Sequence, residues 1–157
     1  MDYETIVLGI VLIIVIYALY KLLVLYRKKT ELPYRKKELL TKHELSFYKK
    51  LRPLANKYGF VVISKIRLAD LVEVDTDKTK EFAKYFAKIK AKHIDFGLVR
   101  PENMEVAYLI ELDDKSHNRA DRIERDEFVN ALCRKTGYTL IRTCNDTSEV
   151  ERVLSEN

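Results

Sequence analysis

The sequence predicts an α/β domain, built on a mixed four-stranded sheet flanked by helices and preceded by one transmembrane helix. Three observations support this fold class. A long apolar run lies near the amino terminus, short apolar runs of strand length recur after it, and segments with helical periodicity separate most of those runs. The resulting order is helix, strand, helix, strand, strand, helix, strand, helix. It is typical of a sheet with helices packed on its faces.

The apolar run from Thr5 to Tyr26 predicts a membrane-spanning helix, because Lys21 is its only charged residue. As a helix it would be roughly 33 Å long, enough to cross a hydrocarbon core of about 30 Å. Acidic residues precede the run and basic residues follow it, so the positive-inside rule places the carboxyl-terminal part in the cytoplasm. We therefore expect a single-pass protein of the cell membrane with its amino terminus outside. A cleaved signal peptide and a buried core helix are the alternatives, but the run has no basic region before it.

Residues 27–40 are expected to form a basic juxtamembrane linker, and residues 41–157 a cytoplasmic domain. Each basic residue near an anionic lipid surface contributes about 1 kcal/mol, so we expect the linker to lie on the membrane. The net charge of +5 permits a further anionic partner. The two cysteines lack metal-site spacing, which argues against a zinc site or a disulfide framework.

The first helix of the domain is expected to begin at Thr41 and to end at Gly59. Thr41 is a good N-cap, and Glu44 three residues later completes a capping box in the stretch "TKHE". The next run, "FVVISKI" from Phe60 to Ile66, predicts a buried strand.

The remaining elements follow from periodicity and from turn residues. The stretch "TDKTKEFAKYFAKIKAK", residues 76–92, predicts an amphipathic helix. The runs "HIDFGLV" and "EVAYLIEL" predict two strands, and the short "RPENM" between them is typical of a hairpin. A helix from about residue 119 to 135, the strand "YTLIRT" and the helix "DTSEVERVLSE" complete the domain.

Acidic residues gather where two of these strands end. Glu111 and Asp113 are two residues apart, so a strand points both side chains to one face. Asp95 lies in the preceding strand, and a hairpin would bring it close to Glu111. Two such carboxylates repel each other at a cost of several kcal/mol unless a cation neutralises them. Hard oxygen ligands favour Mg²⁺ or Mn²⁺, so the sequence predicts a divalent-metal site at Asp95 and Glu111.

The series "HIDFGLV…AYLIELDDKSH…RDEFVNALCRKTGYTLIRT" resembles the restriction-endonuclease-like PD-(D/E)xK superfamily. The similarity is greatest to the branch of very-short-patch-repair endonucleases and uncharacterised bacterial domains, with its E-x-D-G-x-x-H pattern. It covers roughly Thr41 to Thr143. Two positions depart from the pattern: Asp114 replaces the branch's glycine, and Asp113 stands where the superfamily's lysine usually stands.

The resemblance implies a metal-dependent nuclease acting on nucleic acid, with DNA favoured. Asp95 and Glu111 match the metal carboxylates, and Glu44 matches the acidic residue that the first helix often contributes as a further ligand. The other implied catalytic residues are Asp113, Lys115, as a substitute for the missing lysine, and His117, for proton transfer. The implied Arg-Asp pair is Arg125 with Asp126, and the arginine that could reach a phosphate is Arg142.

The lysines of the amphipathic helix have three interpretations. Lys80, Lys84, Lys88 and Lys92 recur four residues apart. They form either a solvated surface stripe, a wall along a nucleic-acid groove, or a contact with anionic membrane lipid. For the domain as a whole, the alternative to a nuclease is a catalytically inactive module on the same fold, which binds nucleic acid or protein at the membrane.

Overall fold

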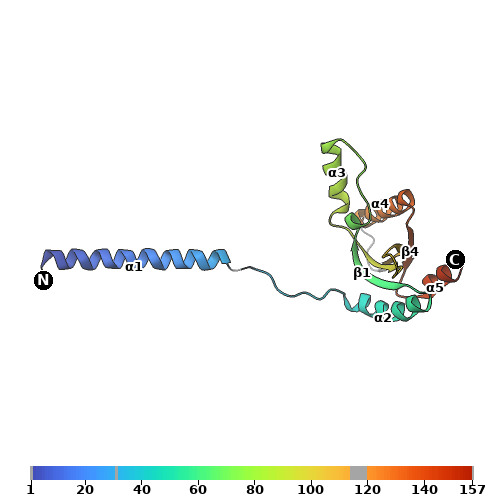
Figure 1. Cartoon of the computed structure of the whole chain (residues 1–157), viewed down its shortest axis with the longest axis horizontal. Coiled ribbons are helices and arrows are strands. Elements are labelled where there is room, and N and C mark those ends of the chain that lie inside the picture. Colours follow the sequence, from blue (N-terminus) through green and yellow to red (C-terminus); the bar gives the residue numbers. More distant parts are fainter. Residues whose placement is uncertain (1, 31, 114–119, 157) are drawn as a thin grey trace. The chain divides into compact units, whose positions relative to one another are not determined.

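The computed structural model describes residues 2–30, 32–113 and 120–156. The chain divides into two compact units, Met1–Lys37 and Glu38–Asn157. The first unit contains one long helix, α1 (Tyr3–Thr30), whose stretch Tyr3–Lys28 has a mean hydropathy of 2.7 and is long enough to cross a membrane (Figure 1). Such a helix is consistent with a single-pass anchor or with a signal sequence. It continues to Thr30, so the first residues of the predicted linker are helical.

The second unit is an α/β domain with a mixed four-stranded sheet, which confirms the predicted fold class. Its strands lie in the order β1-β2-β3-β4. The first two pairings are antiparallel and β3 pairs with β4 in parallel. The elements are α2 (Lys42–Lys57), β1 (Val61–Arg67), the 3₁₀ turn η1 (Leu68–Asp70), α3 (Thr79–Ile89), β2 (His93–Val99), β3 (Val106–Leu112), α4 (Ala120–Thr136), β4 (Thr139–Thr143) and α5 (Ser148–Ser155).

Helices cover both faces of the sheet, and each face has its own hydrophobic cluster (Figure 1). On one face α2 and α5 pack against the strands, with Phe47 and Phe96 fully buried and their ring centroids 5.6 Å apart. On the other face η1, α3 and α4 contribute to a cluster around Leu109 and Val129. The alternation of side chains along the strands supplies both clusters.

The start of α2 is fixed by the predicted capping box. The Thr41 hydroxyl accepts a hydrogen bond from the Glu44 amide at 3.2 Å, and a Glu44 carboxylate oxygen accepts one from the Thr41 amide at 2.7 Å. Two of the amides that a helix start leaves without partners are thereby satisfied. Gly59, just after the helix, has φ +78°, a conformation that glycine adopts without steric cost.

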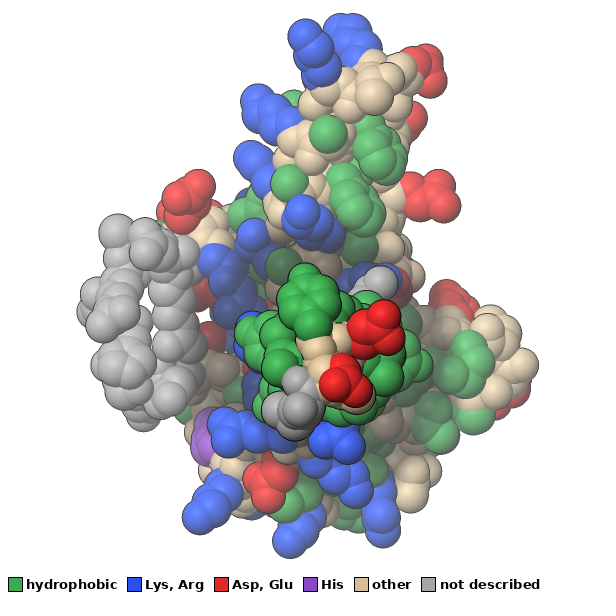
Figure 2. Space-filling view, turned by 90° about the vertical axis from the view of Figure 1, so that its left-hand side faces the viewer, with side chains coloured by type: hydrophobic (Ala, Val, Ile, Leu, Met, Phe, Trp, Pro, Cys, Tyr) green, Lys and Arg blue, Asp and Glu red, His purple; other side chains and the backbone are tan. Residues whose placement is uncertain are grey.

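Helix α3 is shorter than predicted, because it begins at Thr79 and ends at Ile89. The Thr76 hydroxyl accepts a hydrogen bond from the Lys78 amide at 3.3 Å, which holds the chain in a turn before the helix. The Lys92 amide donates to the Ile89 carbonyl at 3.1 Å, which forms a turn after it. Lysines lie along one side of α3 and hydrophobic side chains along the other (Figure 2).

The strand pair β1–β2 is irregular at Lys65 and Asp95. Lys65 has φ +58°, in the left-handed region that residues with a side chain rarely adopt. In β2 the alternation of faces breaks at Asp95, because Ile94 packs in the cluster with α4 and Phe96 in the cluster with α2. Lys65 and Asp95 thus lie at a local kink in the sheet. Strained backbone of this kind concentrates at functional sites.

Candidate functional site

An open pocket of about 660 Å³ lies beside this kink. We call it the Asp95 pocket. Residues from α2, β1, β2, α4 and the segment before β2 line it, and most carry a charge or a polar ring. They are Glu44, Lys65, Ala91, Lys92, His93, Asp95 and Arg125.

Lys65 bridges the two carboxylates of the Asp95 pocket. Its ammonium forms an ion pair with Glu44, and its Nζ lies 3.3 Å from Asp95 Oδ1. Burial acts to lower the pKa of Lys65, but the hydrogen bond to Glu44 and the charge of Asp95 outweigh burial and raise it. Lys65 is therefore protonated at neutral pH. The prediction from sequence missed this residue, although a lysine in the middle of the apolar "FVVISKI" was a signal that could have found it.

Glu44 is held from two sides. Burial acts to raise its pKa, but hydrogen bonds from Lys65 and from Thr41 outweigh burial and lower it. One carboxylate oxygen faces the Thr41 amide and the other faces Lys65. This geometry places Glu44 beside Lys65, and its predicted role as a metal ligand stays a prediction.

The hairpin brings Asp95 and Glu111 to neighbouring strands. Phe96 pairs with Ile110, and continuing this register by one residue places Asp95 opposite Glu111. Besides burial, the negative charge of Asp95 raises the pKa of Glu111, as expected for two carboxylates that lie near each other. Asp95 is further fixed because its Oδ2 accepts a hydrogen bond from the Leu112 amide at 3.0 Å.

Glu111 is a buried carboxylate, with 6% of its surface exposed. Burial raises its pKa, the nearby Arg125 opposes this effect, and the negative charge of Asp95 adds to it. Its Oε1 lies 3.4 Å from Arg125 and its Oε2 3.8 Å from Arg142. The two arginines do not fully offset the effect of burial, so the fold is less stable with Glu111 ionised than with Glu111 protonated.

Arg142 organises the carboxylates on the α4 side of the sheet. Its guanidinium lies 3.1 Å from Asp113 and 3.4 Å from Asp126, and it donates to Asn130 at 3.3 Å. Because these partners surround it, Arg142 is placed to hold carboxylates in position. Its predicted contact with a phosphate, and the catalytic role of Asp113, stay predictions.

The predicted basic residues do not all reach the Asp95 pocket. Lys92 lines it, and also lines an adjoining hollow with Lys88, Arg125 and Phe128. Lys80 and Lys84 lie on the exposed part of α3 and line neither cavity. The predicted catalytic residues Lys115 and His117 lie outside the described residues.

A divalent-cation site at Asp95 and Glu111 stays a prediction. Within residues 2–30, 32–113 and 120–156, no group of three or more acidic, histidine or cysteine side chains is arranged to hold a metal. Mg²⁺, however, usually binds one or two carboxylates and completes its shell with water and substrate phosphate. Asp95 and Glu111 provide two hard oxygen donors on adjacent strands.

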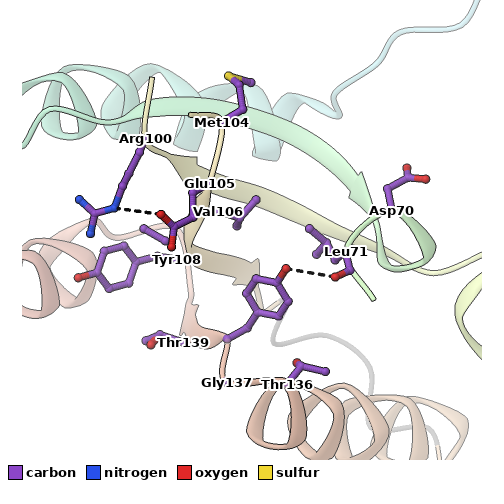
Figure 3. A pocket seen from close by; sticks show the side chains of 12 residues that line it. Asp70, Leu71, Arg100, Met104, Glu105, Val106, Tyr108, Thr136, Gly137 and Thr139 are labelled. Atoms are coloured by element: carbon purple, nitrogen blue, oxygen red, sulfur yellow. Dashed lines mark hydrogen bonds and ion pairs between the residues drawn. The ribbon is translucent and has the colours of Figure 1, made fainter. Parts of the chain in front are cut away.

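A second pocket, of about 640 Å³, lies near the opposite ends of β3 and β4 (Figure 3). The Tyr138 hydroxyl donates to the Leu71 carbonyl at 3.1 Å, and Arg100 lies 3.9 Å from Glu105. In each case two polar groups that line the pocket pair with each other. The Asp95 pocket, which combines carboxylates, lysines and an arginine beside strained backbone, is the stronger candidate for chemistry.

Comparison with known proteins gives one match. A family model described as a protein of unknown function (DUF2726) matches residues 36–156. The match covers every helix and strand after α1, and it therefore includes Lys65, Asp95 and Glu111. No curated protein and no solved structure shows significant similarity to the chain.

Proposed function

We propose a function for this chain, which belongs to the DUF2726 family, from the residues of its Asp95 pocket. In this proposal the chain is a membrane-anchored, metal-dependent phosphodiesterase that cleaves nucleic acid, with DNA favoured. The observation that carries the proposal is the Lys65–Asp95 ion pair at a kinked strand pair beside an open pocket, with the buried Glu111 on the adjacent strand β3. The resemblance to the PD-(D/E)xK superfamily points to the same chemistry.

Three cationic side chains line the Asp95 pocket beside the carboxylates of Glu44 and Asp95, and the cations are suited to contact an anionic ligand. Lys65, Lys92 and Arg125 all line the pocket, and they come from three different elements of the chain. Phosphate oxygens accept hydrogen bonds from lysine and arginine, and such contacts supply most of the sequence-independent affinity for nucleic acid. A phosphodiester is therefore a suitable occupant for the space that these residues enclose.

Each charged side chain in or beside the Asp95 pocket then has a proposed role. Asp95 and Glu111 would hold the metal ion, which when bound would offset the charge of the phosphate and lower the pKa of a bound water. Lys65, protonated and held by Glu44, would donate a hydrogen bond to a phosphate oxygen. In this proposal Lys65 supplies, from β1, the ammonium that the superfamily pattern places where Asp113 stands. Arg142 keeps Glu111 and Asp113 in position.

The experiment uses the full chain in lipid nanodiscs, with Mg²⁺ or Mn²⁺ and with single-stranded DNA, duplex DNA or RNA as substrate. Removing one preorganised charged group from such a site should lower the cleavage rate roughly 100-fold or more. We therefore expect Asp95→Asn, Glu111→Gln and Lys65→Met each to lose most activity. Glu102→Gln, an exposed change in the β2–β3 turn, is the matched control. Cleavage that persists in all three variants would refute the assignment.

We also propose that α1 is a retained single-pass anchor with the domain in the cytoplasm. Its length and apolarity support an anchor, and the basic residues after it support this orientation. Mass spectrometry of the membrane-extracted protein tests the alternative. An intact amino terminus supports an anchor, whereas a chain shortened after the apolar run supports a signal sequence.

The second candidate is a binding module without catalysis. It is favoured by one observation: Lys65 neutralises Asp95 and two arginines pair with Glu111, so the carboxylates have cationic partners from the protein itself. Calorimetry separates the two candidates. Nucleic-acid binding without binding of divalent cations would support the module, and metal binding that is lost in Asp95→Asn would support the enzyme.

A further inference from the structure

Among the described residues, helix α3 is amphipathic and leaves most of its apolar side exposed, although Tyr85 and Ile89 line a hollow with Val74 and Phe128. Every residue from Thr79 to Lys88 is exposed, and Ile89 is its one buried residue. Phe82, Tyr85 and Phe86 expose 43%, 46% and 38% of their surface. Isolated helices shorter than about 12–15 residues are marginal in water, so this helix of 11 residues needs a surface to cover its aromatic side.

The two sides of α3 differ in chemistry (Figure 2). On the apolar side the rings of Phe82 and Phe86 stack with centroids 5.6 Å apart. Residues 78–92 contain one acidic residue, Glu81, and six lysines, while Glu73, Asp75 and Asp77 lie just before this stretch; the lysines are Lys78, Lys80, Lys84, Lys88, Lys90 and Lys92. Two copies of such a helix would repel each other, so the charge favours an anionic partner over a second copy of the chain.

We propose that α3 is an interfacial helix that binds the anionic surface of the membrane. Phe82, Tyr85 and Phe86 would enter the boundary between headgroups and acyl chains, while the lysines contact anionic headgroups. A helix with aromatic residues on one face and lysines on the other is typical of such binding. The inference rests on the proposed anchoring of the chain by α1.

The linker is long enough for this contact. α1 ends at Thr30 and α2 begins at Lys42, which leaves about 11 residues that can span about 36 Å when extended. A domain of this size has a diameter of about 35 Å. A fully extended linker is therefore about as long as the domain is wide, which lets the domain turn α3 toward the bilayer that holds α1. Tethering also keeps the local concentration of that bilayer high, so weak contacts suffice.

Nucleic acid fits α3 less well than lipid does. A bound strand needs lysines beside the aromatic rings, because phosphates and stacked bases alternate along it. In α3 the lysines lie mainly on a different side from the Phe82–Phe86 stack, and Lys84 lies over the Tyr85 ring at 5.7 Å. The lysines nearer the Asp95 pocket, Lys88 and Lys92, lie over the Phe128 ring at 5.8 and 5.3 Å, apart from the Phe82–Phe86 stack.

The chain contains no tryptophan, so one introduced indole reports on α3 alone. The full chain carrying Phe86→Trp is placed in nanodiscs of phosphatidylcholine, with or without phosphatidylglycerol. Emission is recorded with and without lipids brominated on the acyl chain. We expect a blue shift and quenching in the anionic discs, both reduced by Lys80→Gln with Lys84→Gln. Met104→Trp, at an exposed position of the β2–β3 turn, is the control and should show neither effect.

Each other outcome has a clear meaning. An emission spectrum that is the same in both kinds of disc would overturn the proposal. A shift that appears only when DNA is added would also overturn it, and would assign α3 to nucleic acid. If α1 is not an anchor, the chain will separate from the discs during gel filtration. The Phe86→Trp chain is then added to phosphatidylglycerol vesicles, and a missing blue shift there overturns the role of α3 independently.

Discussion

The left-handed backbone of Lys65 leads to a prediction about stability. At φ +58°, a residue that has a Cβ is about 1–2 kcal/mol less stable than in the ordinary conformation, and glycine is almost unaffected. Lys65→Ala and Lys65→Gly both remove the ammonium and its two ion pairs, so they differ mainly in this cost. Glycine in a strand otherwise costs about 0.5–1 kcal/mol relative to alanine. The difference leaves Lys65→Gly more stable than Lys65→Ala, by up to about 1.5 kcal/mol.

Ser64, the preceding residue in the same strand, provides the matched control, because its backbone is regular and it pairs with Phe96. There Ser64→Gly should be less stable than Ser64→Ala by about 0.5–1 kcal/mol. Urea unfolding of the full chain in mild detergent gives the midpoint of each of the four variants. The test is whether glycine raises the midpoint relative to alanine at position 65 and lowers it at position 64. If Lys65→Gly unfolds at a lower urea concentration than Lys65→Ala, the kink that places Lys65 beside Asp95 is not present.

Three further predictions concern the site and its supports. Because the pKa of Glu111 is raised, its contribution to stability is complete below its ordinary pKa of 4.5 and is lost as pH rises through the folded-state value. Glu111→Gln should therefore reduce the loss of stability above that pH, which urea midpoints across the pH range will show; an unchanged profile would contradict the raised pKa. Thr41→Ala should destabilise the domain by about 1 kcal/mol, because the capping box is lost, whereas no shift in the urea midpoint would mean that the cap is unimportant. Lys92→Gln should weaken binding of nucleic acid and lower the slope of log affinity against log salt by about 1, as fluorescence anisotropy at several salt concentrations can test; an unchanged slope would remove Lys92 from the interface.

The order of the elements could be predicted from the sequence because the signals are local. Thr41 and Glu44 fix the start of α2, and the short "RPENM" turn makes β2 and β3 a hairpin. Once that hairpin is assumed, Asp95 is expected near Glu111, but their alignment also depends on the one-residue register shift between Leu98 and Val99, which the sequence did not predict. The ends of α3 were less predictable, because lysine and apolar residues continue at helical spacing beyond Ile89.

The parts of the site that depend on packing could not be predicted. Lys65 has a left-handed φ, although its sequence neighbours include no glycine or asparagine that would signal one. Its ion pairs join β1 to α2 and β2, and no local spacing encodes such contacts. In the same way, Arg142 meets Asp113 and Asp126 because β4 and α4 pack together. The sequence suggested a phosphate contact for this arginine and did not reveal its acidic surroundings.

The two hydrogen-bonding partners of Glu44 have a mechanical consequence. One of its oxygens binds the Thr41 amide, at the point where the tether enters the folded domain, and the other binds the ammonium of Lys65. Tension on the tether that unwound the first turn of α2 would pull this carboxylate away from Lys65 and leave the ammonium with Asp95 alone. A force applied at the tether would thus change the charge balance inside the domain through a single side chain.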